Sequence, residues 1–220
     1  MATFKHPSGK RIHFIHIPRT GGRFIEQNLI QLNDFVWDDY KEKPAWGQKR
    51  VTVNNLYGQV EGVEIAHFTR ELYEKHLDVE GIPHITVIRD PIKRFISGSM
   101  FINKYFDINK KLFNEDIQER MEDPEKFKTT LTKYPFTWHK PQLDFITEDT
   151  HIWRFEDGLG DDFAAWLSGI IGIDITIRQD VQYDEHSFAG DKLIPTPKLI
   201  DNIRSLYEKD IEQLYPELAA

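Results

Sequence analysis

The sequence predicts an α/β fold in which a mostly parallel central sheet is flanked by helices, and three observations favour it. Short apolar segments that suit strands alternate with segments whose apolar residues recur at helical spacing. Two of the strand candidates end in turns that lead directly into a helix. The chain has 220 residues, enough to bury a core without disulfides, and it shows no linker or repeat. We therefore expect a single domain over residues 1–220.

The first half of the chain opens with a strand candidate at residues 10–17, which is rich in β-branched and aromatic residues and ends in a Pro-Arg-Thr-Gly-Gly turn. Helical spacing of apolar residues follows over residues 23–32. Residues 62–68 form another strand candidate that ends in a histidine, and residues 70–77 predict a short helix. The poorly periodic stretch between, residues 34–62, is interpreted as a loop-rich insertion.

The second half of the chain repeats the alternation of strands and helices. The expected strands are residues 84–88 and 150–155, and the expected helices are residues 92–106, 161–169 and 198–214. Residues 110–133 predict two further surface helices, which are broken at Pro124. Because strands that alternate with helices usually pair in parallel, we expect a mostly parallel sheet.

Composition and charge exclude several classes of function. The 28 Lys and Arg residues against 36 Asp and Glu residues leave a formal charge of −8, which argues against nucleic acid as a partner. The chain contains no cysteine, so disulfide scaffolds, thiol nucleophiles and Cys-ligated metals are excluded. No signal-peptide pattern and no long apolar run occur, so we expect a cytoplasmic protein without a membrane partner. The oligomeric state stays open.

The glycine turn at residues 16–24 (HIPRTGGRF) is the most informative segment. A strand that feeds a Gly-Gly turn into a helix directs backbone N–H groups and the positive end of the helix dipole at an anion. Arg19, Thr20 and Arg23 add two cations and a hydroxyl. The segment matches neither G-x-x-x-x-G-K-[ST] nor G-x-G-x-x-G. Considered alone, it fits an ordinary turn with surface arginines equally well.

A second basic segment, residues 88–98 (IRDPIKRFISG), again joins a strand to a helix. Arg89 at the strand end and Ser97 on the helix can hold a phosphate, the guanidinium in a bidentate fork. The alternative is a structural ion pair between Arg89 and Asp90, and for Lys93 a solvated helix face is favoured. Together the two segments predict two separate anion sites.

The two segments in this order resemble the sulfotransferases, especially carbohydrate sulfotransferases of the heparan sulfate 2-O and 6-O kind and their bacterial relatives. The second segment matches the family motif R-D-P-x-x-R-x-x-S completely, at Arg89, Asp90, Pro91, Arg94 and Ser97. The first segment departs from P-K-T-G-G-T-S twice, with Arg19 where Lys is usual and Arg23 where Thr is usual. Residues 153–157 and 206–210 extend the resemblance over about residues 10–215.

The resemblance implies a P-loop-like sulfotransferase fold and the donor 3′-phosphoadenosine 5′-phosphosulfate (PAPS), whose sulfuryl group passes to a hydroxyl or amine, expected to belong to a carbohydrate. The residues expected to bind the donor are Arg19, Thr20, Gly21, Gly22, Arg23, Phe24, Arg89, Ser97 and Lys192. Arg19 is also expected to be catalytic, because its fixed charge can stabilise the leaving group. No metal is expected if arginine supplies that charge.

The resemblance also marks His67 as the general base, since it matches the family's G-H-(F/V) position. His13 and His16 are expected to be structural, because they lie on a strand. His139 precedes a segment that resembles one near the family's acceptor groove. Residues that could line such a groove are Trp37, Trp46, Tyr57, Arg70, Trp138 and Lys140.

Two other functions stay open. A non-catalytic nucleotide- or glycan-binding protein of the same fold is kept open by Arg19 in the place of lysine. A P-loop-like nucleotide-dependent kinase is disfavoured, because the chain lacks the Walker lysine and a clear carboxylate pair for Mg²⁺.

Overall fold

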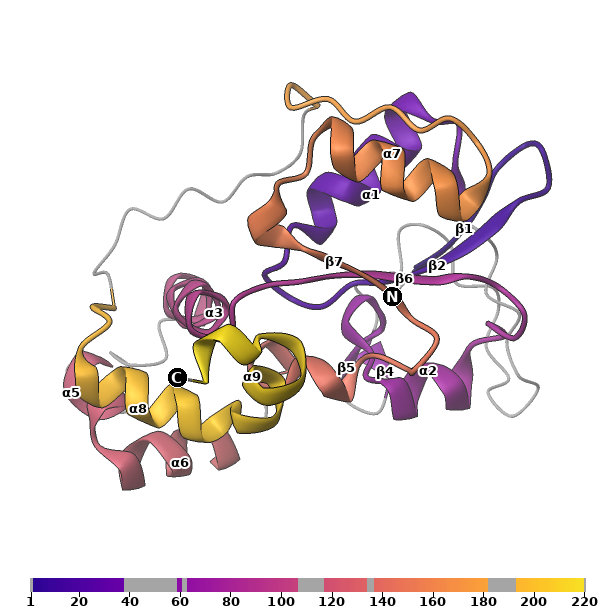
Figure 1. The fold of residues 1–220 in the computed structure, drawn as a ribbon. Helices are drawn as coiled ribbons and strands as arrows, with labels where there is room; N and C mark the ends of the chain where they lie inside the picture. Colours follow the sequence, from indigo (N-terminus) through magenta and orange to yellow (C-terminus); the bar gives the residue numbers. More distant parts are fainter. Residues whose placement is uncertain are drawn as a thin grey trace. The chain divides into compact units, whose positions relative to one another are not determined.

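The chain forms two compact units in the computed structural model, which describes residues 2–37, 59–60, 63–106, 117–133, 137–181 and 193–219 (Figure 1). Unit 1 consists of Met1–Ile88 and Asp144–Asp184, and unit 2 of Arg89–Leu143 and Glu185–Ala220. The expectation of a single domain stays a prediction.

Unit 1 contains a five-stranded sheet in the order β3-β1-β2-β6-β7. The strands are β1 (Ala2–Lys5), β2 (Arg11–Ile15), β3 (Val36–Trp37), β6 (His84–Ile88) and β7 (His151–Arg154). β2 pairs in parallel with β6, and β6 with β7, whereas β1 is antiparallel to both β2 and β3. The sheet is therefore mixed, which corrects the expectation of a mostly parallel sheet.

The antiparallel half arises from an N-terminal hairpin that the sequence analysis missed. The chain reverses after β1, where the N–H of Gly9 donates to the carbonyl of His6 and the N–H of His6 donates to the carbonyl of Lys10. Gly9 has a φ of +88°, a value that glycine adopts without strain. The Pro7-Ser8-Gly9 run was the signal available for this turn.

Helices cover both faces of this sheet, as an α/β fold requires (Figure 1). α1 (Gly22–Leu32) and α7 (Asp161–Ile171) lie on one face, and α2 (Arg70–His76) lies on the other. From the first face Leu29 and Leu167 are fully buried, and from the second Tyr73 is fully buried. The three helices confirm those predicted near residues 23–32, 161–169 and 70–77.

The strand expected over residues 62–68 is wrong for most of its length. Only β5 (Val63–Glu64) is extended, and it pairs with β4 (Gln59–Val60) in a separate two-stranded sheet. A 3₁₀ helix follows at Ile65–His67, and the N–H of Phe68 donates to the carbonyl of Ile65. The burial of Ile65, Ala66 and Phe68 fits a turn, because a half-buried strand would bury alternate residues. Most of the expected insertion lies outside the described residues.

Unit 2 is helical where it is described, and its helices are α3 (Pro91–Phe106), α5 (Ile117–Glu122), α6 (Pro124–Lys133), α8 (Pro197–Leu206) and α9 (Glu208–Leu214). Its core joins Phe95 of α3, Phe127 of α6 and Ile203 of α8. The break at Pro124 is confirmed. The single helix expected over residues 198–214 is corrected to two, because Tyr207 leaves the helical conformation with φ −111°.

Within the described ranges, no helix is long and apolar enough to cross a membrane.

Candidate active site

The turn between β2 and α1 requires glycine at position 21. Gly21 has a φ of +87°, and a Cβ atom there would lie 2.9 Å from Cδ1 of Leu159. Arg19 also adopts a left-handed conformation, with φ +71°, which costs a non-glycine residue about 1–2 kcal/mol. Such strain is typical of loops that are shaped for a ligand.

The N-terminus of α1 is suited to an anion. The first backbone N–H groups of a helix have no acceptor within the helix, and the N-cap residue here is Gly21, which has no side chain to cap them. The first turn also carries no acidic residue, so nothing there offsets the positive end of the helix dipole. The geometry supports the anion site that the glycine turn predicted.

Two of the expected donor-binding side chains point elsewhere. Thr20 is fully buried, and its hydroxyl donates to the carbonyl of Ile17 at 2.8 Å, which closes the turn. The ring of Phe24 is 7% exposed and belongs to the core. Only the backbone N–H groups of these two residues are therefore suited to contact a donor.

A buried pair of side chains lies beneath the turn. Nδ1 of His16 and Oε1 of Glu26 are 2.9 Å apart, and the two side chains are 9% and 10% exposed. The ring of His16 also packs under Gly22, where a Cβ atom would lie 2.2 Å from Cδ2 of the ring. Sequence reasoning assigned His16 a structural role and did not single out Glu26. The spacing of ten residues across a strand–turn–helix was the signal for this pair.

His67 lies against His16. The two rings meet edge to face with their centroids 4.9 Å apart, and Nδ1 of His67 donates to the carbonyl of His16 at 3.5 Å. Because a carbonyl can only accept, this contact places the proton on Nδ1 and leaves the lone pair on Nε2. The structure thus brings His67 to the turn, although His67 ends a 3₁₀ helix and not a long strand.

The surroundings of His67 keep its ring neutral. Burial, followed by the electrostatic effect of the neighbouring His16, holds the pKa of His67 well below the usual value of 6.5, and the charge of Arg23 acts in the same direction. A neutral imidazole near pH 7 can accept a proton. His67, Arg23 and the glycine turn therefore form one candidate site in unit 1.

His13, which sequence reasoning also made structural, is buried in the sheet. It is fully buried, and its ring meets that of Tyr73 edge to face at 4.8 Å. Burial lowers the pKa of His13 well below 6.5. It therefore packs on the α2 side of the sheet, whereas the partner of His16 lies on α1.

In unit 2, the backbone of Arg89 is held by a buried glutamine. The N–H of Arg89 donates to Oε1 of Gln142 at 2.9 Å, and Nε2 of Gln142 donates to the carbonyl of Arg89 at 2.9 Å. Asp210 accepts in turn from the N–H groups of Gln142, at 2.7 Å, and Leu143, at 3.1 Å. Gln142 and Asp210 are fully buried. Neither residue was predicted to act on Arg89.

Asp90 and Arg94 of the second motif have structural roles. Oδ1 of Asp90 accepts from the N–H of Ile92 at 2.8 Å and caps α3. Arg94 is fully buried and donates to the carbonyls of Trp138 and Lys140. Its guanidinium also lies 5.3 Å from the ring centre of Tyr207, within the range of a cation–π contact. Arg94 therefore holds unit 2 together.

His139 is packed into the core of unit 2. Its Nε2 lies 3.1 Å from Oγ of Ser99, and its ring stacks on Phe95 at 4.6 Å. Burial, followed by the positive charge of Arg94, lowers the pKa of His139 to about 3. The expectation of a place beside an acceptor groove stays a prediction.

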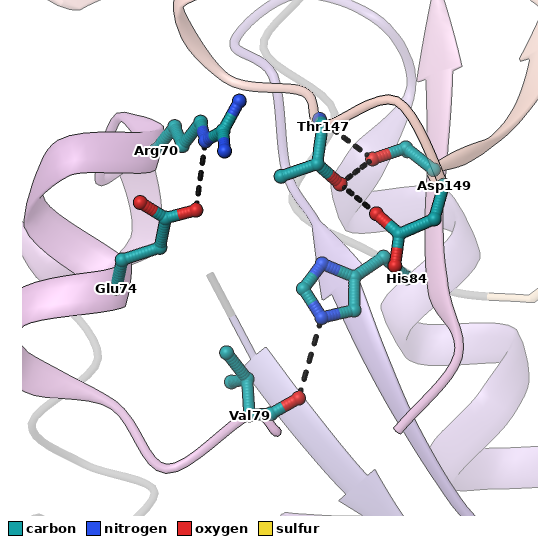
Figure 2. A network of polar contacts seen from close by, with 7 residues as sticks. Arg70, Glu74, Val79, His84, Thr147 and Asp149 are labelled. Carbon is teal, nitrogen blue, oxygen red and sulfur yellow. Dashed lines mark hydrogen bonds and ion pairs between the residues drawn. The ribbon is translucent and has the colours of Figure 1, made fainter. Parts of the chain in front are cut away.

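Other expected site residues are less informative. Ser97 lies half-buried on α3, and Lys93 is exposed, with its Nζ 3.7 Å from Oδ2 of Asp90. Arg70 is exposed on α2, where its Nε donates to Oε1 of Glu74 at 2.7 Å (Figure 2). Lys192, Trp46 and Tyr57 lie outside the described residues.

In the part of the chain that the structure describes, no three His, Asp or Glu side chains form a group that could hold a metal ion.

A strand, a glycine turn and a helix N-terminus beside a neutral histidine are suited to an enzyme that transfers an anionic group. Comparison with known families identifies which one. The model of the sulfotransferase family matches residues 4–183, so the chain belongs to the sulfotransferase family. Neither the curated proteins nor the solved structures give a match.

Proposed function

We propose that this sulfotransferase transfers the sulfuryl group of PAPS to a hydroxyl or amine of an acceptor, with carbohydrates as the acceptor class. The observation that carries the proposal is the position of His67, whose Nδ1 contacts the residue that opens the glycine turn. A base is thereby next to the segment best suited to hold the reacting anion.

In the proposed reaction, the acceptor oxygen attacks sulfur in line with the bond to the bridging oxygen of the donor. That bond breaks with its electron pair on the phosphate, and the products are a sulfate ester and 3′-phosphoadenosine 5′-phosphate (PAP). Nε2 of His67 takes the proton of the acceptor hydroxyl. Arg19 stabilises the charge on the leaving oxygen but does not protonate it, because a guanidinium keeps its proton.

The donor carries two separate anionic groups, and the proposal assigns one to each basic segment. Residues 19–24 hold the 5′-phosphosulfate, chiefly through backbone N–H groups and the two arginines. Arg89, Ser97 and Lys192 hold the 3′-phosphate. The parallel pairing of β2 with β6 supports this assignment, because the chain leaves both strands at the same edge of the sheet.

Donor binding is the first test. Isothermal titration with PAP should give binding to the wild-type protein, with a much higher Kd for Arg89→Ala and an unchanged Kd for Lys93→Ala, an exposed cation on the same segment. Stabilisation by ATP and Mg²⁺ without any binding of PAP would instead favour a kinase and overturn the proposal.

Transfer is the second test, with PAPS as donor and a panel of glycans, lipids and small alcohols as acceptors. Sulfated product on a glycan would support the whole proposal, and product only on another class would correct the acceptor. The second candidate function, a non-catalytic binding protein, is favoured by Arg19 in the place of lysine. PAP binding without transfer to any acceptor would support that candidate.

A further inference from the structure

The buried pair of Glu26 and His16 is not explained by donor binding. A carboxylate and an imidazole are both costly to remove from water, and they are retained where the pair serves a purpose or is well satisfied. Here Oε1 of Glu26 accepts from Nδ1 of His16 at 2.9 Å. The pair lies on α1 and on the turn that precedes it, directly beneath the candidate anion site.

The contact with Glu26 fixes the orientation of His16. An ionised carboxylate can accept a hydrogen bond but cannot donate one, so Nδ1 of His16 carries the proton of this bond. Gly22 closes off the opposite side of the ring, since the backbone at that position leaves no room for a side chain. The ring of His16 is thereby held in one rotamer and one tautomer.

His16 in turn contacts His67 in two ways. Its backbone carbonyl accepts from Nδ1 of His67 at 3.5 Å, and its ring meets that of His67 edge to face at 4.9 Å. Both contacts direct Nε2 of His67 away from the carbonyl of His16. Arg23, which lies on α1, also acts electrostatically on His67.

We propose that Glu26 and His16 are positioning residues that hold the imidazole of His67 with Nε2 towards the acceptor. This inference rests on the proposed function, because it assumes that His67 is the base. A comparable case is a metal-binding histidine whose other N–H donates to a carboxylate. Loss of that carboxylate costs about 10–100-fold in metal affinity or activity.

The test compares two carboxylate-to-amide substitutions in unit 1. Glu26→Gln keeps the shape of the side chain but allows either end of the amide to face His16, so we expect kcat for sulfuryl transfer to fall about 10–100-fold. The Kd for PAP should stay at the wild-type value. Glu74→Gln, a half-exposed carboxylate on α2, is the matched control and should leave kcat unchanged.

A double-mutant cycle separates positioning from a merely structural effect. In a His67→Ala background, Glu26→Gln should cause no further loss, because the group that it positions is already absent. The same fractional loss in both backgrounds, or a raised Kd for PAP with unchanged kcat, would overturn the inference.

A measurement without turnover keeps the two proposals distinguishable. Long-range ¹H–¹⁵N spectra of the wild-type protein should show both His16 and His67 as Nδ1–H tautomers, and Glu26→Gln should change the pattern of both rings. An Nε2–H tautomer at His67 would overturn the inference. Absence of transfer by the wild-type protein would overturn the proposed function, whereas transfer with an additive cycle would overturn only the positioning role.

Discussion

Two histidines, His67 in unit 1 and His139 in unit 2, show how the neighbouring groups decide what an imidazole can do. Both have pKa values that burial lowers. His67 lies against His16, whose ring bonds to a carboxylate, and it stays partly exposed. His139 packs between Ser99 and Phe95 near the guanidinium of Arg94. The first environment places the ring beside the glycine turn, and the second uses the ring as packing.

The largest effects should follow from removing each ring. His67→Ala should lower kcat about 10²–10⁴-fold, the usual contribution of a general base, and should leave the Kd for PAP unchanged. His139→Ala should instead preserve kcat and lower the free energy of unfolding by about 1–3 kcal/mol, because Ser99 loses its partner and Phe95 its stacked neighbour. Steady-state kinetics and urea unfolding measure both. Normal turnover in His67→Ala would remove the contrast.

A methyl group at the start of α1 disturbs the environment of His67 without replacing any of its ionisable groups. In Gly22→Ala the new Cβ atom would lie 2.2 Å from the ring of His16, so the ring or the turn must shift. We expect a loss of about 1–3 kcal/mol in stability together with a fall in kcat. Gly169→Ala on α7 is the control, because a Cβ atom there meets nothing within 4 Å. Thermal unfolding and kinetics of the two variants provide the comparison, and equal behaviour would contradict it.

In unit 2, the hydrogen bonds that join Asp210, Gln142 and the backbone of Arg89 should affect donor affinity. Asp210→Asn weakens the acceptor of the N–H groups of Gln142 and Leu143, each a bond to a charged group worth about 1.5–3 kcal/mol. We expect a lower melting temperature and a several-fold higher Kd for PAP, with kcat at saturating donor preserved. Asp201→Asn, on the exposed side of α8, should change neither quantity. A Kd that stays unchanged while stability falls would limit Gln142 to a structural role.

The sequence was a good guide wherever an element depends on local pattern. The strand at residues 84–88 and the helix that begins at Gly22 follow directly from apolar spacing and from a turn. Two elements depend on partners distant in the sequence and could not be found this way. Tyr207 ends α8, and its hydroxyl donates to the carbonyl of His139, 68 residues away. Residues 65–67 form a 3₁₀ helix, and Nδ1 of His67 contacts the carbonyl of His16, 51 residues away.

The candidate site was predictable to the same limited extent. The glycine turn and His67 were found from motifs, which report residues that are consecutive or at family positions. Glu26 was not, because its role appears only when α1 folds back over the turn and brings its carboxylate to His16. Gln142 and Asp210 were missed for the same reason, since 68 residues separate them.

The smallest expected effect is the pH dependence, and it bears on both histidines. His67 must be neutral to accept a proton, and burial, followed by the electrostatic effect of His16, holds its pKa well below 6.5. The ratio kcat/KM, which reports on the free enzyme, should therefore stay level from pH 8 down past 6.5 and fall only as the pH drops through the lowered pKa. His139, with a pKa of about 3, should not contribute to that fall, so His139→Ala should give the same profile. An inflection at or above pH 6.5 in the wild-type protein would show that the free enzyme exposes His67 to water, and that the buried contact with His16 is not the reactive arrangement.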